Sequence, residues 1–345
     1  MFNKNFIKFL FIICLTISSF SFSEELTTNF SDTVVRAAID IGSGATKLKV
    51  ALVNIKTQKI EKVLVNESFT VQYQEELEKS TNNTFNEAVM NTGIAAIKKS
   101  KEIALQYGAK KVIGVATASF RKAANVDQYV ARILRETDVQ VHIIDQQLEG
   151  ILGFKATTAQ LQTAVKDVVV WDIGGGSFQF STLDQNGEVL VYRGEDASIP
   201  FKNHVLKAIK LEDPSHTNTP NPLNKGQMQQ AQQHARQLAQ KVDRVFKEKL
   251  SDPQTCVVGI GNIFAYGIYP LVEKQTPFKQ VKLSTNVDQL ENKSDIALGG
   301  GDYVNVSVTN PLLVLGFMQA LGINTMEIAD VNNADGALLH NTFWQ

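Results

Sequence analysis

A glycine-rich hairpin motif occurs twice in this chain and constrains its fold more than any other feature. In 167–183, DVVVWDIGGGSFQFSTL, a short apolar run ends on Asp172, three glycines turn the chain, and polar and apolar residues then alternate. In 34–53, VVRAAIDIGSGATKLKVALV, an apolar run likewise ends on Asp40, before Gly-Ser-Gly and a second alternating run. Each pattern predicts a buried strand, a tight turn and a strand that returns antiparallel.

The repetition is more informative than either copy. A single glycine-rich turn is as often an ordinary hairpin as a ligand site, but here the turn and both flanking strand patterns recur together. The separation is too wide for a solenoid repeat. We infer two similar domains that face one another, each offering a glycine loop to a shared cleft. Glycines let the backbone approach a ligand closely, with N–H groups free to bind an anion such as phosphate.

The remaining patterns predict an α/β fold in which both halves follow a similar order of elements. After the first hairpin we expect strands at 60–65 and around 69–73, then helix 85–107, strand 111–117, a helix ending near 136, strand 139–144 and helix 147–160. After the hairpin at 168–192 we expect helix 201–210, a proline-rich loop at 212–226, one polar helix over 227–250, strand 256–260, helix 311–321, strand 326–329 and helix 333–343.

Length and composition fit two globular domains. The chain has 345 residues, of which 43% are hydrophobic and 20% charged, enough for two cores of ordinary size. We place the first domain at 34–160 and the second at 161–345. The final helix is free to pack back across the hinge between them.

The first 23 residues have the form of a secretory signal peptide. Lys4 and Lys8 flank an apolar stretch at 9–17, and Ser-Phe-Ser at 21–23 gives a small-x-small cleavage site. The alternative is an uncleaved N-terminal anchor, although the apolar stretch is short for one. Cys14 lacks the small residues expected before a lipid-modified cysteine. We therefore expect a secreted or periplasmic protein with no stable membrane insertion after cleavage.

Charge and cysteine content limit the partners. Without 1–23 the chain carries 32 basic and 35 acidic residues, a net charge of −3. A near-neutral chain without basic runs gives no electrostatic footprint for nucleic acid. Only Cys256 remains, so no intrachain disulfide is expected despite the oxidising destination. The sequence leaves formation of a homodimer open.

Five blocks of sequence, taken in order, resemble the exopolyphosphatase and guanosine pentaphosphate phosphohydrolase (Ppx/GppA) family of the actin-like ATPase superfamily. The resemblance implies duplicated ribonuclease H-like domains, with mixed five-stranded sheets flanked by helices and an interdomain cleft. The blocks do not extend to the C-terminal helical domain of the longer members, so we expect the chain to resemble the short, two-domain form. The blocks are DIGSGATKLKV at 40–50, GVATASFRKAAN at 114–125, VHIIDQQLEGILGF at 141–154, WDIGGGSFQFS at 171–181 and VVGIGNIFA at 257–265.

The resemblance implies hydrolysis of a terminal phosphoanhydride of polyphosphate or guanosine pentaphosphate. Glu149 matches the carboxylate that activates the attacking water, and Arg121 matches a basic residue that pairs with substrate phosphate. Asp40 and Asp172 match the loop aspartates that hold Mg²⁺, largely through waters. Each residue alone also has an ordinary structural role: a solvated arginine, an acid in the first turn of a helix, or a turn cap.

Three glycine loops are implied to bind phosphate. The backbone N–H groups of the first two loops would surround the phosphate oxygens, aided by two serine hydroxyls, and the third loop would complete the site. The implied phosphate-binding residues are Gly42, Ser43, Gly44, Gly174, Gly175, Gly176, Ser177, Gly259, Gly261 and Asn262.

Departures from the family pattern leave other functions open. Family members usually carry further acids before the catalytic position and Ala-Arg after it, whereas 147–151 is Gln-Leu-Glu-Gly-Ile. Glu149-Gly150-x-x-Gly153-Phe154, together with Gln179, is instead similar to secreted apyrases, which act on nucleoside di- and triphosphates. A sugar kinase or ATPase is disfavoured because no ATP supply is expected outside the cytoplasm. A non-catalytic phosphate-binding module remains an alternative from another class; retention of Asp40, Glu149 and Asp172 argues against it.

Overall fold

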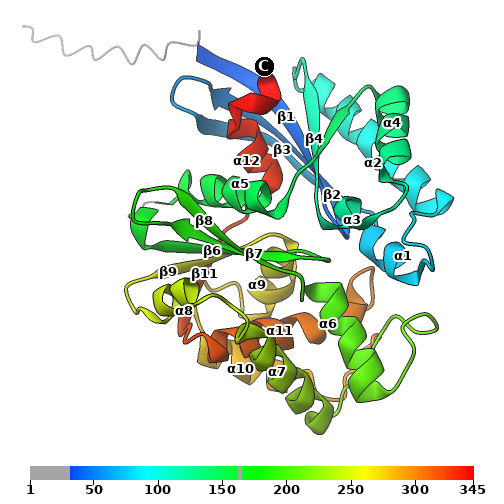
Figure 1. Cartoon of the computed structure of the whole chain (residues 1–345), viewed down its shortest axis with the longest axis vertical. Coiled ribbons are helices and arrows are strands. Elements are labelled where there is room, and N and C mark those ends of the chain that lie inside the picture. The colour runs from blue at the N-terminus through cyan, green and yellow to red at the C-terminus, as the bar shows by residue number, and fades with distance from the viewer. Residues whose placement is uncertain (1–31, 162–164) are drawn as a thin grey trace, which may run out of the picture.

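The computed structural model describes residues 32–161 and 165–345. The signal peptide predicted for 1–23 lies outside the described residues. Figure 1 shows two lobes, one above the other, each built around a sheet. Within the described residues, no helix combines the length and apolar character that crossing a membrane requires.

The first lobe contains a five-stranded sheet in the described part of the chain, with strand order β3-β2-β1-β4-β5. The predicted hairpin forms its centre, because β1 and β2 pair antiparallel and β4 joins β1 in parallel. The two strands expected at 60–65 and 69–73 are one strand, β3, and the chain then enters helix α1. The strands are β1 (Thr33–Ile41), β2 (Ala45–Asn54), β3 (Lys59–Thr70), β4 (Val112–Ala116) and β5 (Gln140–Ile143).

The second sheet repeats this order and adds one strand. Its order is β10-β11-β9-β6-β7-β8 in the described part of the chain, so five of its strands follow the order of the first sheet. The expectation of five strands was wrong here because β10 spans only two residues, too few for any alternation in the sequence. The strands are β6 (Val168–Ile173), β7 (Phe178–Leu183), β8 (Val189–Gly194), β9 (Cys256–Ile260), β10 (Phe278–Lys279) and β11 (Thr325–Ile328).

Helices cover the outer face of each sheet because alternate residues of each strand are apolar on that side. In the first lobe, apolar residues of β1 and β2 pack against α2 and α4. In the second lobe, Trp171, Phe178 and Phe180 form an aromatic core with Phe264 and Phe317. The helices of the two lobes, apart from the two described next, are α1 (Tyr73–Lys79), α2 (Glu87–Gln106), α3 (Ala118–Lys122), α4 (Val126–Thr137), α6 (Ser198–His204), α7 (Lys225–Ala239), α8 (Arg244–Ser251), α9 (Tyr269–Leu271), α10 (Gln280–Asp288) and α11 (Thr309–Ala320).

Two further helices occupy the space between the lobes. Helix α12 (Asn333–Leu339), at the end of the chain, packs on the first sheet, and α5 (Gln146–Thr158) packs on the second. The two helices touch closely, since a Cβ at Gly336 would lie 2.3 Å from the carbonyl oxygen of Leu152. In Figure 1, α12 therefore appears in the upper lobe beside α5, although it follows the whole second lobe in sequence. The domain boundary near residue 160 stays a prediction.

The helix expected over 227–250 is interrupted. It forms α7 and α8, separated by residues 240–243, where the side chain of Val242 turns into the core. Helix α7 is also less solvated than its glutamine-rich composition suggests. Its alanines form a smooth face against α11, where a Cβ at Gly316 would lie 2.5 Å from the Cβ of Ala235. Small residues thus allow close helix packing that hydrophobicity alone does not reveal.

Candidate active site

The two glycine loops adopt the same turn at the ends of β1 and β6. The N–H of Gly42 donates to the carbonyl oxygen of Ala45 at 2.9 Å, and the N–H of Gly174 donates to that of Ser177 at 2.9 Å. The duplicated motif therefore produces a duplicated backbone conformation. The loops also touch, because a Cβ at Gly175 would lie only 2.7 Å from the Cβ of Ser43.

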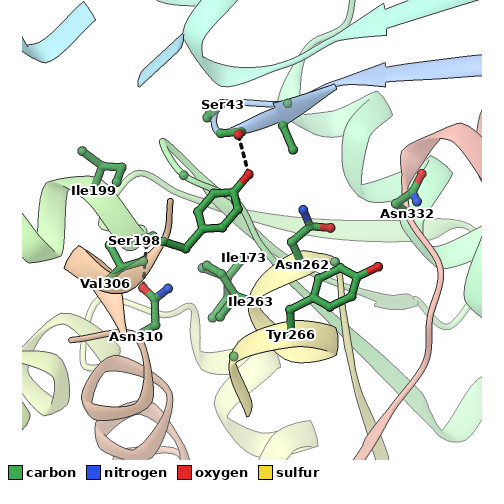
Figure 2. A pocket seen from close by; sticks show the side chains of 18 of the residues that line it. Ser43, Ile173, Ser198, Ile199, Asn262, Ile263, Tyr266, Val306, Asn310 and Asn332 are labelled. Carbon is green, nitrogen blue, oxygen red and sulfur yellow. Dashed lines mark hydrogen bonds between the residues drawn. The ribbon is translucent and has the colours of Figure 1, made fainter. Parts of the chain in front are cut away.

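A cavity of about 460 Å³ lies between the lobes where the loops meet. Figure 2 shows Ser43 on one side of it and Asn262, Tyr266 and Asn310 on the other. Among the described residues that line it, the ionisable acids and bases other than tyrosine are three carboxyl groups and one ammonium group: Asp40, Glu149, Asp172 and Lys47. A phosphate-rich ligand would enter this site more easily with a cation that offsets the carboxylates.

Glu149 lies in the first turn of α5, which Asp145 caps by accepting a hydrogen bond from the N–H of Leu148 at 2.7 Å. Its position is set by close packing on the second sheet, where a Cβ at Gly150 would lie 2.5 Å from Cγ1 of Val191. The glycines of the Glu-Gly-x-x-Gly pattern therefore bring the carboxyl of Glu149 close to the cleft from a helix that lies between the lobes.

Arg121 holds this carboxyl group. Its guanidinium lies 2.8 Å from Oε2 of Glu149, and it also donates to the carbonyl oxygen of Ile144 at 2.9 Å and to Oγ of Ser177 at 3.0 Å. Burial nevertheless raises the pKa of Glu149 to about 8, against the lowering effect of Arg121. Glu149 therefore holds its proton at neutral pH unless further positive charge enters the cleft.

Asp40 and Asp172 end the first strand of each hairpin and face the cleft. Nζ of Lys47 lies 3.0 Å from Oδ2 of Asp40. Burial acts to lower the pKa of Lys47, but the two carboxylates outweigh it and hold the pKa above its ordinary value. Burial raises the pKa of Asp172 to about 6, although Lys47 opposes that effect. The two loops thus have the same backbone conformation but differ in the charge around their aspartates.

The aspartate pair fits a hard cation. Oδ1 of Asp40 is buried and has no hydrogen-bond partner within residues 32–161 and 165–345, so it is available to a further ligand. Gly261 leaves Asp172 accessible, since a Cβ there would lie 2.9 Å from its Oδ1. The described residues contain no group of three His, Cys, Asp or Glu placed to hold a metal. A cation here would complete its coordination with water and phosphate oxygens, as Mg²⁺ commonly does.

Most of the predicted site residues line the cavity. The exceptions are Arg121, Gly176 and Gly259. Arg121 lies behind Glu149, and a Cβ at Gly176 would lie 2.5 Å from Oε1 of Gln74. A Cβ at Gly259 would lie 2.5 Å from Cδ1 of Phe264, so this glycine serves packing within the second lobe. The predicted residues that line the cavity are Asp40, Gly42, Ser43, Gly44, Glu149, Asp172, Gly174, Gly175, Ser177, Gly261 and Asn262.

Three described cavity residues with a charged or aromatic side chain were not predicted: Lys47, Tyr266 and Tyr303. Lys47 sits directly opposite Asp40 in the β1–β2 pair, so the register of the hairpin would have identified it. Tyr266 and Tyr303, which are 63% and 42% exposed as whole residues, add aromatic rings to the cavity lining. Nothing in the local sequence marks these tyrosines, because they reach the cleft only through the packing of the second lobe.

The model of the Ppx/GppA phosphatase family matches residues 51–339. The chain is similar to the bifunctional 3-dehydroquinate synthase/phosphatase of Fusobacterium nucleatum, with 26% identity over 168 residues, covering 47% of this chain and 25% of that protein. It is also similar to exopolyphosphatase 1 of Mycobacterium leprae, with 29% identity over 97 residues, covering 28% of this chain and 29% of that protein. The chain therefore spans less than a third of the length of these curated relatives.

Solved structures share the fold over nearly their whole length. The Ppx/GppA family member of Aquifex aeolicus matches with a TM-score of 0.65 and 18% identity, covering 90% of this chain and 98% of that one. An exopolyphosphatase-like protein matches with a TM-score of 0.72 and 16% identity, covering 89% and 97%. The predicted two-domain actin-like ATPase fold is thereby confirmed. A nucleoside triphosphate hydrolase of Neospora caninum has a more distant likeness, with a TM-score of 0.51 and 10% identity, covering 90% and 93%.

Proposed function

We propose that this chain, which belongs to the Ppx/GppA phosphatase family, hydrolyses phosphoanhydrides and releases the terminal phosphate of polyphosphate or guanosine pentaphosphate. The observation that carries the proposal is the position of Glu149. Its buried carboxyl group lies on the cavity that also receives both glycine loops and both loop aspartates. Phosphoryl transfer depends mainly on positioning and charge stabilisation, and this cavity gathers the groups for both.

The chain's own residues divide the work of the reaction. Arg121 orients the carboxyl of Glu149 and favours its ionised form. Once ionised, Glu149 accepts a proton from the water that attacks the terminal phosphorus. Backbone N–H groups of the loops and the ammonium group of Lys47 bind phosphate oxygens and stabilise the charge that develops on them.

Asp40 and Asp172 would hold Mg²⁺, because both offer carboxylate oxygens at the cavity and Oδ1 of Asp40 is buried without a hydrogen-bond partner in the described part of the chain. When bound, the ion neutralises phosphate charge. We also propose that the protein acts outside the cytoplasm, on the basis of the signal-peptide pattern at 1–23.

A hydrolase of nucleoside di- and triphosphates is the second candidate. It is favoured by the two exposed tyrosines, Tyr266 and Tyr303, and by the single lysine among the described cavity residues. A long polyphosphate chain would be bound more readily by several basic groups. A nucleoside, by contrast, can pack its base on an aromatic ring.

The test is phosphate release with Mg²⁺ from polyphosphate, guanosine pentaphosphate, ATP and ADP in parallel. Glu149→Gln should reduce release by at least about 100-fold, while Glu102→Gln, on the exposed side of α2, should not. Activity confined to ATP and ADP would favour the second candidate. Binding without release from any of the four would overturn the hydrolase proposal and leave a phosphate-binding module.

A further inference from the structure

A buried ion pair joins the two lobes beside the cavity. Nζ of Lys202, in α6, lies 2.7 and 2.9 Å from the two carboxylate oxygens of Glu75, in α1. Asn305 of the second lobe donates to the same carboxylate at 2.8 Å. Lys202 is 1% exposed, and Glu75 and Asn305 are each 7% exposed. The proposed reaction uses none of these three residues.

A second set of contacts reaches the first glycine loop. The hydroxyl of Tyr303 donates to the carbonyl oxygen of Gly44 at 2.7 Å, and the side chain of Gln72 donates to the carbonyl oxygen of Asp302 at 3.1 Å. Asp302 and Tyr303 belong to the segment 299–305 of the second lobe. It begins with three glycines at φ of 95°, 66° and 92°, values that glycine adopts most easily.

The ion pair favours one relative position of the lobes. Moving two charges out of water is costly, and the cost is recovered only where the geometry is good and the remaining hydrogen-bonding groups are satisfied. Lys202 meets both oxygens of Glu75, and Asn305 supplies a further donor. A displacement of α1 from α6 would separate the two charges.

These contacts fix the distance between the two glycine loops. Ser43 and Gly175 touch across the cavity, and Gln74, next to Glu75, lies against Gly176. The helix that carries Glu75 therefore contacts both loops, because the N–H of Gln74 also donates to the carbonyl oxygen of Ser43 at 2.9 Å. A shift of this helix changes the distance between the two sets of backbone N–H groups.

We propose that Glu75, Lys202 and Asn305 form an interdomain clasp that holds the glycine loops at this spacing, with Tyr303 as the positioning residue of the first loop. The inference rests on the proposed function and adds specificity to it. A cavity of about 460 Å³ held between locked loops accommodates the end of a short substrate. A clasp that fixes the size of this cavity limits how much of a phosphate chain it takes in, so we expect short chains to be preferred over long ones.

The first experiment measures amide hydrogen exchange in the full chain and in Tyr303→Phe, which removes only the hydroxyl. We expect faster exchange in 40–50 and in 299–307. Tyr107→Phe is the matched control, because Tyr107 is 49% exposed after α2, and it should leave both segments unchanged. Unchanged exchange in Tyr303→Phe would overturn the positioning role. Glu75→Gln puts a side-chain amide of the same size in place of the carboxylate and removes the charge opposite Lys202, and it should give the same result. Unchanged exchange in Glu75→Gln would overturn the clasp.

The second experiment separates positioning from general destabilisation by kinetics. For tripolyphosphate we expect KM to rise about ten-fold in Tyr303→Phe, with a smaller change in kcat, because the loop binds substrate but does not react. The ratio of kcat/KM for tripolyphosphate to kcat/KM for long polyphosphate should fall as well. Equal effects on both substrates would contradict the specificity role. If the wild-type chain releases no phosphate, the proposed function fails, and the clasp is then judged by hydrogen exchange alone. If the wild-type chain releases phosphate but hydrogen exchange is unchanged in the variants, only the clasp fails.

Discussion

The two hairpins share a backbone but differ in the residue that faces the aspartate. In the first hairpin Asp40 pairs with Lys47, and in the second Asp172 pairs with Gln179. Both loops make the same turn hydrogen bond at 2.9 Å. One carboxylate thus has a cation beside it, whereas the other stands opposite an amide.

This difference gives two loops of the same backbone geometry different surroundings in the cavity. The first loop brings positive charge to the cavity through Lys47. The second loop instead connects to the candidate base, since Ser177 accepts a hydrogen bond from Arg121, which holds Glu149. The comparison can be tested by changing equivalent positions in the two hairpins.

The largest effect is expected where the hairpins are alike. Asp40→Asn and Asp172→Asn each remove a proposed metal ligand, and each should reduce Mg²⁺-dependent phosphate release by at least about 100-fold. Binding of Mn²⁺, followed by electron paramagnetic resonance, should weaken in both. Asp184→Asn, in the exposed β7–β8 turn, is the control. If only one of the two variants loses metal affinity, the loops do not share the ion.

The next largest loss of activity is expected from a change at Lys47, where the two hairpins differ. Lys47→Gln gives the first hairpin the amide of the second and removes the one ammonium group among the described cavity residues. Because hydrogen bonds to charged groups are strong, we expect kcat/KM to fall roughly 10- to 100-fold, mainly through KM.

Lys62→Gln, on the exposed side of β3, is the matched control for this variant and should not change kcat/KM. An unchanged KM in Lys47→Gln would show that Lys47 serves Asp40 alone and does not bind substrate.

The sequence was sufficient for the duplicated sheets because each hairpin is specified locally. An apolar run, a glycine turn and an alternating strand fix both the pairing and the turn. The two-residue β10 carries no such pattern, and the position of α12 on the first sheet depends on contacts between residues far apart in the chain. Local patterns cannot encode such packing.

The residues of the candidate site likewise divide into those that the sequence could predict and those that it could not. Asp40, Asp172 and Glu149 could be predicted because each lies within a motif, and all three line the cavity. Tyr303 could not be predicted, since it meets Gly44 across 259 residues of sequence. Arg121 was found by resemblance, but its partner, Glu149, became visible only when α3 and α5 were brought together.

A smaller effect is expected on the pH dependence of kcat/KM, through the ion pair between Arg121 and Glu149. The base must be ionised, and burial raises the pKa of Glu149 to about 8. At low Mg²⁺, kcat/KM should therefore rise about ten-fold per pH unit below that value and level off above it. Arg121 lowers this pKa, so Arg121→Met should move the rise to higher pH.

The measurement is the pH profile of kcat/KM for both proteins. Arg135→Met, on the exposed end of α4, is the control and should keep the wild-type profile. A profile that does not move in Arg121→Met would mean that another group limits the reaction.

The smallest effect tests the contact between the loops. Gly175→Ala would place a Cβ 2.7 Å from the Cβ of Ser43, whereas Gly44→Ala would place one 3.6 Å from Cε1 of Tyr303, an ordinary contact. We expect Gly175→Ala to reduce the free energy of unfolding by about 1–3 kcal/mol, as overpacking does. Gly44→Ala should change it much less. Urea denaturation of both variants gives the comparison.

Since neither glycine has a positive φ, backbone strain does not separate these two variants, and the difference between them reports the contact alone. Equal stabilities would mean that the lobes separate freely enough to accept a methyl group between the loops. The same result would argue against the proposed clasp, because a clasp that holds the loops at a fixed spacing must resist that methyl group.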